Sequence, residues 1–588
     1  MMLPMAAAPF MVNGLSVRAM ARSLMTSTFD CDALSDRVLV LIQLHGGNDG
    51  LNTLIPLNQY GLYRNLRPFI GVKDSGPRQY LTLDSTLPGD QQIGLHPDLV
   101  DLKSMYDDGQ VRLIQNVAYE NMNGSHFRGT DIWLSGMGPA DLTGPPETGW
   151  WGRYLDHRFP NYPDDYPNND MPDPPGLEFG SHIISLGFHR QSGIPMGITL
   201  ANDPTDFANA VLGSGAALPS QFPHSDYGRE LEYLVEMERS TNAYAQRLTD
   251  VYTQGANTPG VAYPETYHTQ ASRNYHNPLA PQLKTIARLL SGGISTKIFL
   301  ARLGGFDTHE GQGLADKPSF GSHGALLYHL SSAVKAFQDD LKGLGLEDRV
   351  LTVTFSEFGR TVAENSTYGT DHGNSAPMMV FGKGIEAGVS GSNPDLSNLN
   401  NNRLVGFDID YRQVFATVLQ DWFGANYGTL DHVEFYQYAA DKIDLINNHY
   451  LDTQGNALDF VADTSCDPTP DLPPPTSTGG GNGGGNGSGG TTHLAHAEGL
   501  NFSFGPNPTH GVLFLNLESP RMTIATAEVM DLQGRGLLRQ EWRLFSGENR
   551  TELDLDGLSA GSYLLRVIER PGSQFGEKLL AEVKVVVR

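Results

Sequence analysis

Acidic and imidazole side chains collect beside two apolar runs near the middle of the chain, where they could bind a metal ion. Residues 350–355, VLTVTF, are apolar and β-branched, which is typical of a strand covered on both faces of a parallel sheet. Glu357 follows this run, and His372 precedes a second apolar run at 376–381. Because ligands bind beyond the carboxyl ends of strands in open α/β sheets, Glu357 is predicted to lie at a site, with His372 on the loop into a neighbouring strand.

Two further predicted strand ends carry groups of the same kind. Asp307 and His309 follow the predicted strand 296–303 with the D-x-H spacing of a metal-binding pair, although such pairs also arise by chance. Asp49 follows the predicted strand 37–44 in a glycine-rich turn, where ordinary turn chemistry is the competing interpretation. Carboxylates and imidazoles together suit Zn²⁺ or a harder divalent ion.

A serine stands where a helix is predicted to begin. Ser125 and His126 follow the predicted strand 111–117 and precede a helical pattern. A serine at this place is commonly the N-cap of the helix. A helix N-terminus also offers free amides and positive potential to a developing anion, so the same position suits a nucleophile that attacks a phosphoryl or sulfuryl centre. The residues alone favour the cap and leave the nucleophile as an alternative.

The elements that would position these residues alternate between strand and helix. After the strand at 37–44 comes a helical pattern at 95–106 and then the strand at 111–117. Two more helices are predicted at 282–290 and 324–344. This βαβ pattern predicts an α/β fold with a doubly wound, mostly parallel sheet.

A long segment interrupts this alternation. Residues 138–280 are rich in Pro, Asp, Asn and Tyr, with a helical portion at 229–251. Such an insertion is predicted to form a cap over the strand ends rather than to add to the sheet, and substrate choice is expected to lie in it.

Six motifs make residues 37–445 resemble the alkaline phosphatase and sulfatase superfamily, and more closely its branch known as domain-of-unknown-function family fifteen-oh-one. They are LIQLHGGNDGLN, NGSHF followed by a tryptophan, GGFDTHEGQ, TFSEFGRT, GTDHG and DYRQVFATVLQDWFG. The resemblance implies an alkaline phosphatase-like domain over residues 30–465 and metal-dependent hydrolysis of phosphate or sulfate esters. An anionic small molecule or a glycan ester is the substrate expected.

The resemblance also implies roles for individual residues. It implies metal ligands at Asp49, Asp307, His309, Glu357 and His372, and catalytic residues at Ser125 and His126. Asp307, His309 and His372 would share one ion, for which Zn²⁺ is predicted with Ca²⁺, Mg²⁺ and Mn²⁺ as alternatives. Asp49 and Glu357 supply only carboxylates, so a site formed by them is predicted to be weaker, to prefer a harder ion, or to be empty.

One position departs from the superfamily pattern. Phe358 stands where the superfamily has the histidine of an Asp-His pair, so one imidazole ligand is missing. This departure keeps an alternative function open, in which the domain is catalytically degenerate and binds a glycan or a partner at the cell surface.

Charge and composition exclude some partners. The chain has 588 residues and a net charge of −26, from 40 basic and 66 acidic residues, which argues against nucleic acid or an anionic membrane as a partner. An anionic substrate would need a local cation. No apolar run reaches the roughly 18 residues of a membrane-spanning helix. Cys31 and Cys466 could pair in an oxidising compartment, and two separate thiols are an equal alternative.

Both ends of the chain indicate export. Residues 1–29 contain a segment like a signal-peptide cleavage site, Ala19-Met20-Ala21, and are predicted to be the remnant of a signal peptide or a disordered segment. A Pro- and Gly-rich linker at 466–501 leads to alternating short strands at 502–588, which predict a small all-β sandwich.

The C-terminal motifs FGPNPTHG, DLQGR, LDGLSAGSY and KVVV resemble the sorting domain of the bacterial type IX secretion system. This resemblance implies that the type IX machinery is a partner and that the protein crosses both membranes of a Bacteroidota-type cell, to be secreted or anchored at the surface. A carbohydrate-binding sandwich is the competing interpretation, but the segment lacks an evident aromatic platform.

Overall fold

The chain divides into two compact units, residues 1–479 and 480–588, which are described separately. The computed structural model describes residues 11–12, 15–16, 36–139, 146–180, 184–200, 204–205, 222–223, 225, 228, 235, 244–314, 317–447, 449–451, 457–459, 472, 474–475, 502–505, 512–519, 523–530, 535–544, 547–555, 558, 561–570 and 578–587. Most of the predicted signal peptide, both cysteines and most of the linker lie outside these residues.

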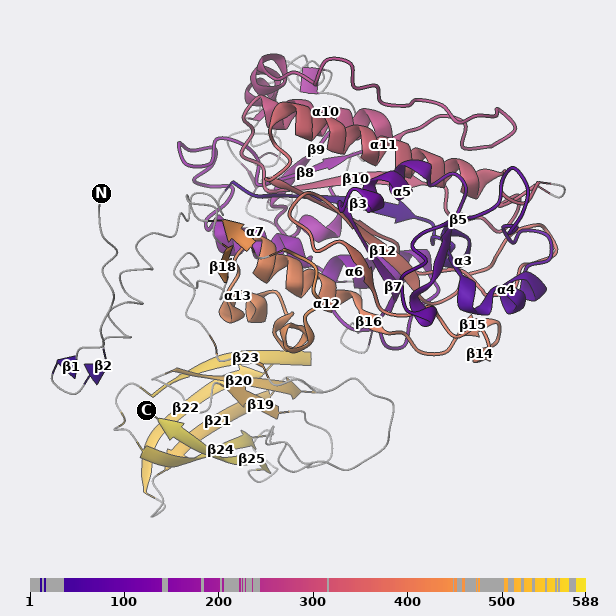
Figure 1. Ribbon diagram of the computed structural model, residues 1–588. Coiled ribbons are helices and arrows are strands. Elements are labelled where there is room, and N and C mark those ends of the chain that lie inside the picture. Colours follow the sequence, from indigo (N-terminus) through magenta and orange to yellow (C-terminus); the bar gives the residue numbers. More distant parts are fainter. Residues whose placement is uncertain are drawn as a thin grey trace. The chain divides into compact units, whose positions relative to one another are not determined.

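A nine-stranded sheet forms the centre of the first unit, in the order β13-β7-β12-β11-β3-β10-β8-β9, with β16 paired to β7 (Figure 1). The strands are β3 (Val38–His45), β7 (Val111–Ala118), β8 (Gly176–Phe179), β9 (Gly197–Leu200), β10 (Ile298–Gly304), β11 (Val350–Phe355), β12 (Ala376–Phe381), β13 (Gly388–Ser390) and β16 (Ile409–Asp410). All neighbouring pairs are parallel except β11 with β12 and β12 with β7. The predicted mostly parallel α/β sheet is therefore confirmed.

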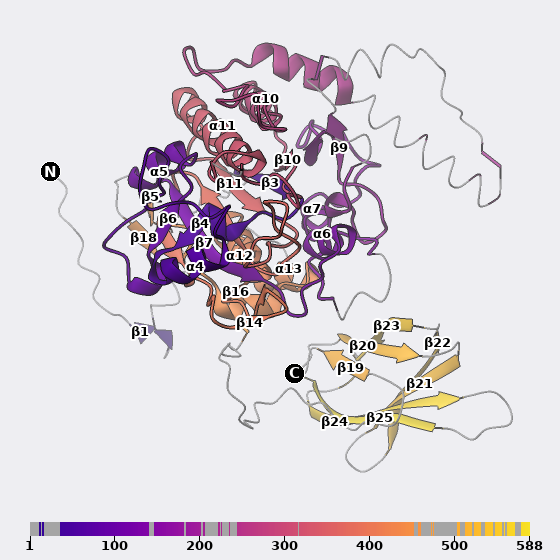
Figure 2. The same cartoon turned by 90° about the vertical axis from the view of Figure 1, so that its right-hand side faces the viewer.

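Helices cover both faces of this sheet, as Figures 1 and 2 show. One face carries α10 (Leu279–Ser291) and α11 (Ser322–Leu344), and α5 (Val100–Asp107) packs on α11. The other face carries α6 (His126–Ser135), α7 (Trp150–Arg158), α12 (Tyr411–Thr417) and α13 (Tyr427–His432). The central strands are mainly apolar because both faces are buried, and every residue of β11 and β12 is buried.

The segment 138–280 differs from its prediction, since part of it does add to the sheet. β8 and β9 extend the sheet beyond β10 in parallel register, and residues 244–254 are helical. The two strands have only four residues each, and β8 follows Pro174-Pro175, so the sequence around it resembles a loop. Their sequences, GLEF and GITL, are nevertheless largely buried, with β8 paired to β10 and β9 paired to β8.

Because β12 runs in the opposite direction to its neighbours, the residues before β12 lie at the same edge of the sheet as the residues after β7 and β11. β12 is antiparallel to β11 and to β7, so its first residue lies at the edge where β11 and β7 end. The loop that enters β12 therefore meets the loops that leave β3, β7, β10 and β11. The predicted meeting of Glu357 with His372 needs this reversal, because the start of a parallel strand would lie at the opposite edge.

Smaller elements complete the first unit. They are α3 (Gly50–Thr53), α4 (Tyr60–Leu66), the sheet of β4 (Leu54–Pro56), β6 (Ile93–Leu95) and β5 (Leu81–Thr82), the hairpin of β14 (Leu399–Asn400) and β15 (Arg403–Leu404), and the paired strands β17 (His449–Leu451) and β18 (Ala457–Asp459). At the N-terminus β1 (Met11–Val12) pairs with β2 (Leu15–Ser16).

The second unit is all-β, as predicted, with two antiparallel sheets. One contains β19 (Phe502–Gly505), β20 (Val512–Ser519) and β23 (Gly547–Asp554). The other contains β22 (Gly536–Leu544), β21 (Thr523–Met530), β24 (Gly561–Arg570) and β25 (Lys578–Val587). Across the described part of the chain, no helix has both the length and the apolar character needed to span a bilayer.

Candidate metal centre

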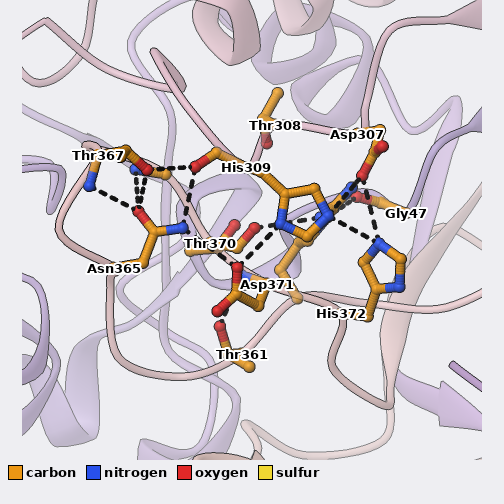
Figure 3. Close-up of polar contacts among 12 residues, drawn as sticks. Gly47, Asp307, Thr308, His309, Thr361, Asn365, Thr367, Thr370, Asp371 and His372 are labelled. Carbon is orange, nitrogen blue, oxygen red and sulfur yellow. Dashed lines mark hydrogen bonds and ion pairs between the residues drawn. The ribbon is translucent and has the colours of Figure 1, made fainter.

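Three histidines come together at the edge of the sheet, and each is oriented by an acceptor at its Nδ1 atom. His126 begins α6, with Nδ1 2.9 Å from Glu357 Oε1. His309 follows β10, with Nδ1 2.8 Å from Asp371 Oδ1 (Figure 3). The Nδ1 atom of His372 lies 2.6 Å from the carbonyl oxygen of Gly124. Ionised carboxylates and carbonyls only accept hydrogen bonds, so Nδ1 carries the proton in each ring.

The opposite nitrogens of these rings converge on one carboxylate oxygen. Asp307 Oδ1 lies 3.4 Å from Nε2 of His126, 3.1 Å from that of His309 and 3.3 Å from that of His372. Nε2 of His309 and Nε2 of His372 are 2.9 Å apart (Figure 3). In neutral rings protonated at Nδ1, all four of these atoms present lone pairs to one another, an arrangement that a cation would stabilise.

The donor set therefore fits a divalent metal ion. Ligand atoms on a tetrahedral zinc ion lie about 3.3 Å apart, given bonds of about 2.0 Å. His126, Asp307 and His372 meet the distance requirement for a shared ion, and His309 lies beside them. The Nε2 atom of His126 is buried and has no hydrogen-bond partner among the described residues. The acceptors at Nδ1 are the partners that usually fix metal-binding histidines.

Electrostatics at the cluster follow from the same contacts. The hydrogen bond to Glu357 raises the pKa of His126 above its ordinary value. Partial burial would raise the pKa of Asp307, but the hydrogen bond from Arg360 and the nearby positive charge lower it to about 2. Asp307 is thus an anion at all ordinary pH values, and the surroundings that favour a proton on His126 would also favour a metal cation.

Arg360 holds the loops of the cluster together. Its guanidinium is buried and donates to Asp307 Oδ1 at 2.7 Å, to the carbonyl of Phe306 at 2.8 Å and to that of Gly47 at 2.8 Å. It also donates to the carbonyls of Gly46 and Thr370. The arginine therefore fixes three loops at the strand ends, and its donors are occupied by the protein itself.

Asp49 lies in a different environment from the other predicted ligands. It is buried and its Oδ2 atom forms an ion pair with Arg67 Nη1 at 2.6 Å, while Gln312 donates to the same oxygen. Its Oδ1 atom accepts from the amide of Leu51 and caps α3. Burial opposes ionisation, yet Arg67, His323 and Gln312 lower the pKa of Asp49 below its ordinary value. The metal role of Asp49 stays a prediction, and these contacts favour a structural role.

Replacing Asp49 with asparagine should destabilise the first unit by about 3–5 kcal/mol, because the buried Arg67 guanidinium would lose its counter-charge. Urea unfolding of both proteins at pH 7 checks this value, and metal content should not change. Because the folded-state pKa is lowered, the stability that Asp49 contributes is present above the ordinary aspartate pKa and is lost as pH falls through the lowered value. The free energies of unfolding of the two proteins should therefore become equal in acid. If Asp49→Asn instead lost metal without losing stability, Asp49 would be assigned as a metal ligand.

Glu357 and Phe358 form the wall behind the cluster. Glu357 is buried, and its Oε1 atom also accepts from the amide of Gly46 at 2.8 Å. Through Oε1 it orients His126. Its Oε2 atom is buried and has no hydrogen-bond partner among the described residues, and its metal role stays a prediction. Phe358 is fully buried, with its ring centroid 4.8 Å from that of His126 and 4.6 Å from that of His372. An apolar ring thus packs where the superfamily pattern has an imidazole.

Ser125 takes the N-cap position of α6, but its side chain makes no capping hydrogen bond. The residue is exposed, and only its backbone is tied down, by an amide donating to Asn123 Oδ1 at 2.9 Å. Both neighbours in sequence touch the cluster: the Gly124 carbonyl contacts His372, and His126 contacts Asp307. The common role of a capping serine is therefore not supported by its contacts, and the residue lies between two neighbours that contact the cluster.

A pocket of about 360 Å³ opens at the cluster. It is lined by His45, Gly46, His126, Phe127, Thr130, Asp131, Gly305 and Asp307. Phe127 is 86% exposed, although it is apolar and stands beside His126. This pocket can admit a small ligand and would present it with an aromatic ring.

The sequence predicted most members of this cluster but not all of the residues that hold them in place. Asp307, His309 and His372 are brought together, as their places at strand ends suggested. His126, predicted to be catalytic, lies in the same group. The roles of Arg360 and Asp371 were not predicted, although both stand within the quoted motifs TFSEFGRT and GTDHG. An arginine three residues after a strand-end acid, in a strongly acidic chain, was the available signal for the first.

Comparisons with known proteins identify two segments of the chain. Residues 285–433 match the family described as protein of unknown function DUF1501, and residues 504–582 match the secretion system C-terminal sorting domain. Both resemblances seen in the sequence are thereby confirmed. The first segment contains His309, Glu357 and His372 but neither Asp49 nor His126. A search of the curated proteins finds no match.

Solved structures show only distant likeness. Dimeric latent PorU from Porphyromonas gingivalis is 18% identical over 15% of this chain and 9% of its own, with a TM-score of 0.14. A protein in the alkaline phosphatase superfamily from Vibrio parahaemolyticus is 10% identical over 61% of this chain and 63% of its own, with a TM-score of 0.26. The PsFucS1 sulfatase from Pseudoalteromonas sp. is 11% identical over 92% of this chain and 87% of its own, with a TM-score of 0.29.

Proposed function

We propose that this chain, which carries a DUF1501 segment and a type IX sorting domain, is an exported metal-dependent hydrolase of phosphate or sulfate esters. The observation that carries the proposal is the convergence of three imidazole Nε2 atoms on Asp307 Oδ1, with every Nδ1 atom held by an acceptor. Oriented imidazoles and a carboxylate are the ligands of hydrolytic zinc sites.

In this proposal the metal is held by His126, Asp307, His309 and His372. Glu357, Asp371 and the Gly124 carbonyl fix the three rings in the tautomer that leaves Nε2 free. When bound, a divalent metal ion supplies positive charge that neutralises the oxyanion of the ester. His126 therefore serves as a ligand in place of the catalytic role that the sequence suggested.

Ser125 is the proposed nucleophile. Its oxygen forms a bond to the phosphorus or sulfur centre while the bond from that centre to the ester oxygen breaks, and the hydroxyl proton passes to the departing oxygen, which leaves as the alcohol. Water then hydrolyses the ester formed on Ser125, which restores the hydroxyl and releases inorganic phosphate or sulfate. The first amides of α6 have no acceptor within the helix and point toward charge that develops at this position. The pocket beside His126 would receive the alcohol half of the ester, which passes the exposed ring of Phe127.

The test uses the purified full-length chain. Metal content by mass spectrometry should reach about one ion per chain. The protein should hydrolyse p-nitrophenyl phosphate or p-nitrophenyl sulfate, or a sulfated or phosphorylated glycan, and a chelator should abolish the activity. A chain that binds no divalent ion at saturating zinc would end the proposal.

A binding protein without turnover is the second candidate function, favoured by the Phe358 ring in the place of an imidazole. A two-metal phosphatase would need that ligand, and the second site is left with two carboxylates, of which Asp49 is already held by Arg67, Gln312 and the amide of Leu51. Metal bound at full occupancy, together with binding of a sulfated glycan and no hydrolysis of any ester, would select this candidate.

Export through the type IX route is proposed from the sorting domain at residues 504–582. Deleting residues 502–588 should retain the protein in the cell envelope with its first unit folded, because the two units are separate compact bodies. Fractionation of cells that produce each form, with detection of the first unit, checks this result. Normal amounts of the truncated protein at the surface or in the medium would contradict it.

A further inference from the structure

The hairpin of β14 and β15 is rigidly built. Its two-residue turn consists of Asn401 and Asn402, both with positive φ, 48° and 62°. Asparagine tolerates this left-handed conformation better than most residues, and two such residues in succession form the tight turn that suits the twist of a hairpin. The position of the next residue, Arg403, is therefore well defined by the backbone.

The same hairpin is fastened to the loop that carries His372. Asn402 accepts from the amide of Val362 at 2.9 Å and exchanges two side-chain hydrogen bonds with the backbone of Ala363, at 2.6 and 3.1 Å. On the other side, Asn374 donates to the carbonyl of Leu404 at 2.8 Å. The residues before and after Arg403 are thus both bound to the segment between β11 and β12, which fixes the arginine relative to the metal centre.

The guanidinium of Arg403 reaches the backbone beside Ser125. A Cβ atom placed on Gly124 would lie 3.6 Å from Arg403 Nη2, 3.9 Å from Nη1 and 3.8 Å from the Cβ of His372. Arg403 and His372 therefore approach the same point of the loop that leads into α6. Gly124 is also the residue whose carbonyl orients His372.

This guanidinium has its donors free. Arg403 is exposed, and within the described ranges no ion pair, hydrogen bond or ring contact uses its side chain. Arg360 differs from Arg403, because it is buried and donates all of its side-chain hydrogen bonds to four carbonyls and Asp307. The chain has 66 acidic residues, yet none of the described ones pairs with Arg403, whose backbone position is fixed by the hairpin. An arginine of this kind is available to bind an anionic ligand.

We propose that Arg403 binds the anionic group of the substrate on the Gly124 side of Ser125, and that it determines specificity for a charged oxyanion. The inference rests on the proposed function for the identity of the anion, a phosphate or sulfate group. The planar guanidinium offers parallel N–H donors that match two oxygens of such a group. It also supplies the positive charge that a protein of net charge −26 needs beside its metal centre to hold an anion.

Isothermal titration with inorganic phosphate and inorganic sulfate tests the proposal on the full-length chain. Arg403→Gln should weaken the binding of at least one of these anions roughly 10- to 100-fold, since a charge-assisted bidentate contact is lost. Arg403→Lys should give an intermediate affinity, because lysine keeps the positive charge but lacks the two parallel N–H donors of the guanidinium. Metal content and melting temperature should match the wild type, as the side chain is exposed.

The matched control is Arg349→Gln, which makes the same charge change at a surface arginine paired with Asp36, just before the start of β11 and so away from the edge where that strand ends. It should bind the anions like the wild type. Equal affinity in Arg403→Gln and the wild type, equal weakening in both variants, or no anion binding by the wild type would overturn the proposal. Anion binding that depends on Arg403 in a chain without metal or turnover would instead retain this site and end the proposed hydrolase.

Discussion

Replacing Ser125 with alanine should lower the turnover of a phosphate or sulfate ester by at least roughly a thousandfold, because a covalent nucleophile has no substitute once its oxygen is removed. Metal content should stay at the wild-type level, since the imidazoles and Asp307 do not depend on the hydroxyl. Turnover in single-substrate assays and metal content by mass spectrometry, measured on the same preparations, check both parts.

A matched control separates the loss of the nucleophile from a general effect of removing a hydroxyl. Ser104→Ala makes the same change at an exposed position on α5 and should leave both quantities unaltered. If water attacks the ester directly, Ser125→Ala would retain most of its rate. That result would remove Ser125 from the mechanism and leave the metal centre as proposed.

Replacing His372 with alanine should reduce metal affinity about a hundredfold or more and abolish turnover with it. The ring contributes one Nε2 atom to the group around Asp307, and even the outer partners of metal ligands typically change affinity 10- to 100-fold. Competition with a chromophoric chelator gives the affinity of each protein. The stability of the metal-free protein should change little, because His372 is partly exposed.

The control for this variant is His276→Ala, which removes an exposed histidine that belongs to another part of the chain. Its metal affinity should equal that of the wild type. If His372→Ala bound metal as tightly as the wild type, the convergence of the rings would reflect hydrogen bonding to Asp307 alone, with protonated imidazoles in place of an ion.

How far the sequence predicts this architecture depends on the kind of feature. Uncharged runs buried on both faces, such as 350–355 and 376–381, predict their strands residue for residue, since a short apolar run is typical of a strand covered on both faces. The direction of β12 is not contained in its composition. It follows from the length and path of the connection from β11, which are properties of the assembled sheet.

In the candidate metal centre, too, the sequence predicts some residues, whereas the contacts of others depend on the assembled fold. Asp307 and His309, which follow one predicted strand, and His372, which precedes another, were possible metal ligands from the sequence, and the resemblance assigned them to one ion. The contacts of Asp49 could not be foreseen, because its partner Arg67 has no distinguishing local pattern and meets it only through the fold of α3 and α4. Arg403 is likewise an ordinary surface residue in the sequence, and only the hairpin places it beside Gly124.

The place of β3 in the sheet sets a constraint on how the protein reaches its native state. β3 lies between β10 and β11, and Val38 pairs with Val350. The first strand of the sheet to be synthesised therefore cannot pair with both of its neighbours until the residues between Val38 and Val350 have been made. At roughly 5–20 residues per second, the ribosome needs about fifteen seconds to a minute to make that intervening chain.

During this interval the run VLVLIQLH, apolar along almost its whole length, is exposed without partners and is prone to aggregate. Pairings of such long range also make spontaneous refolding slow. The family segment 285–433, produced alone, lacks the strand that separates β10 from β11 and should remain unfolded. Assembly of the proposed metal ligands is thus a late event, completed only after the chain has been made past His372.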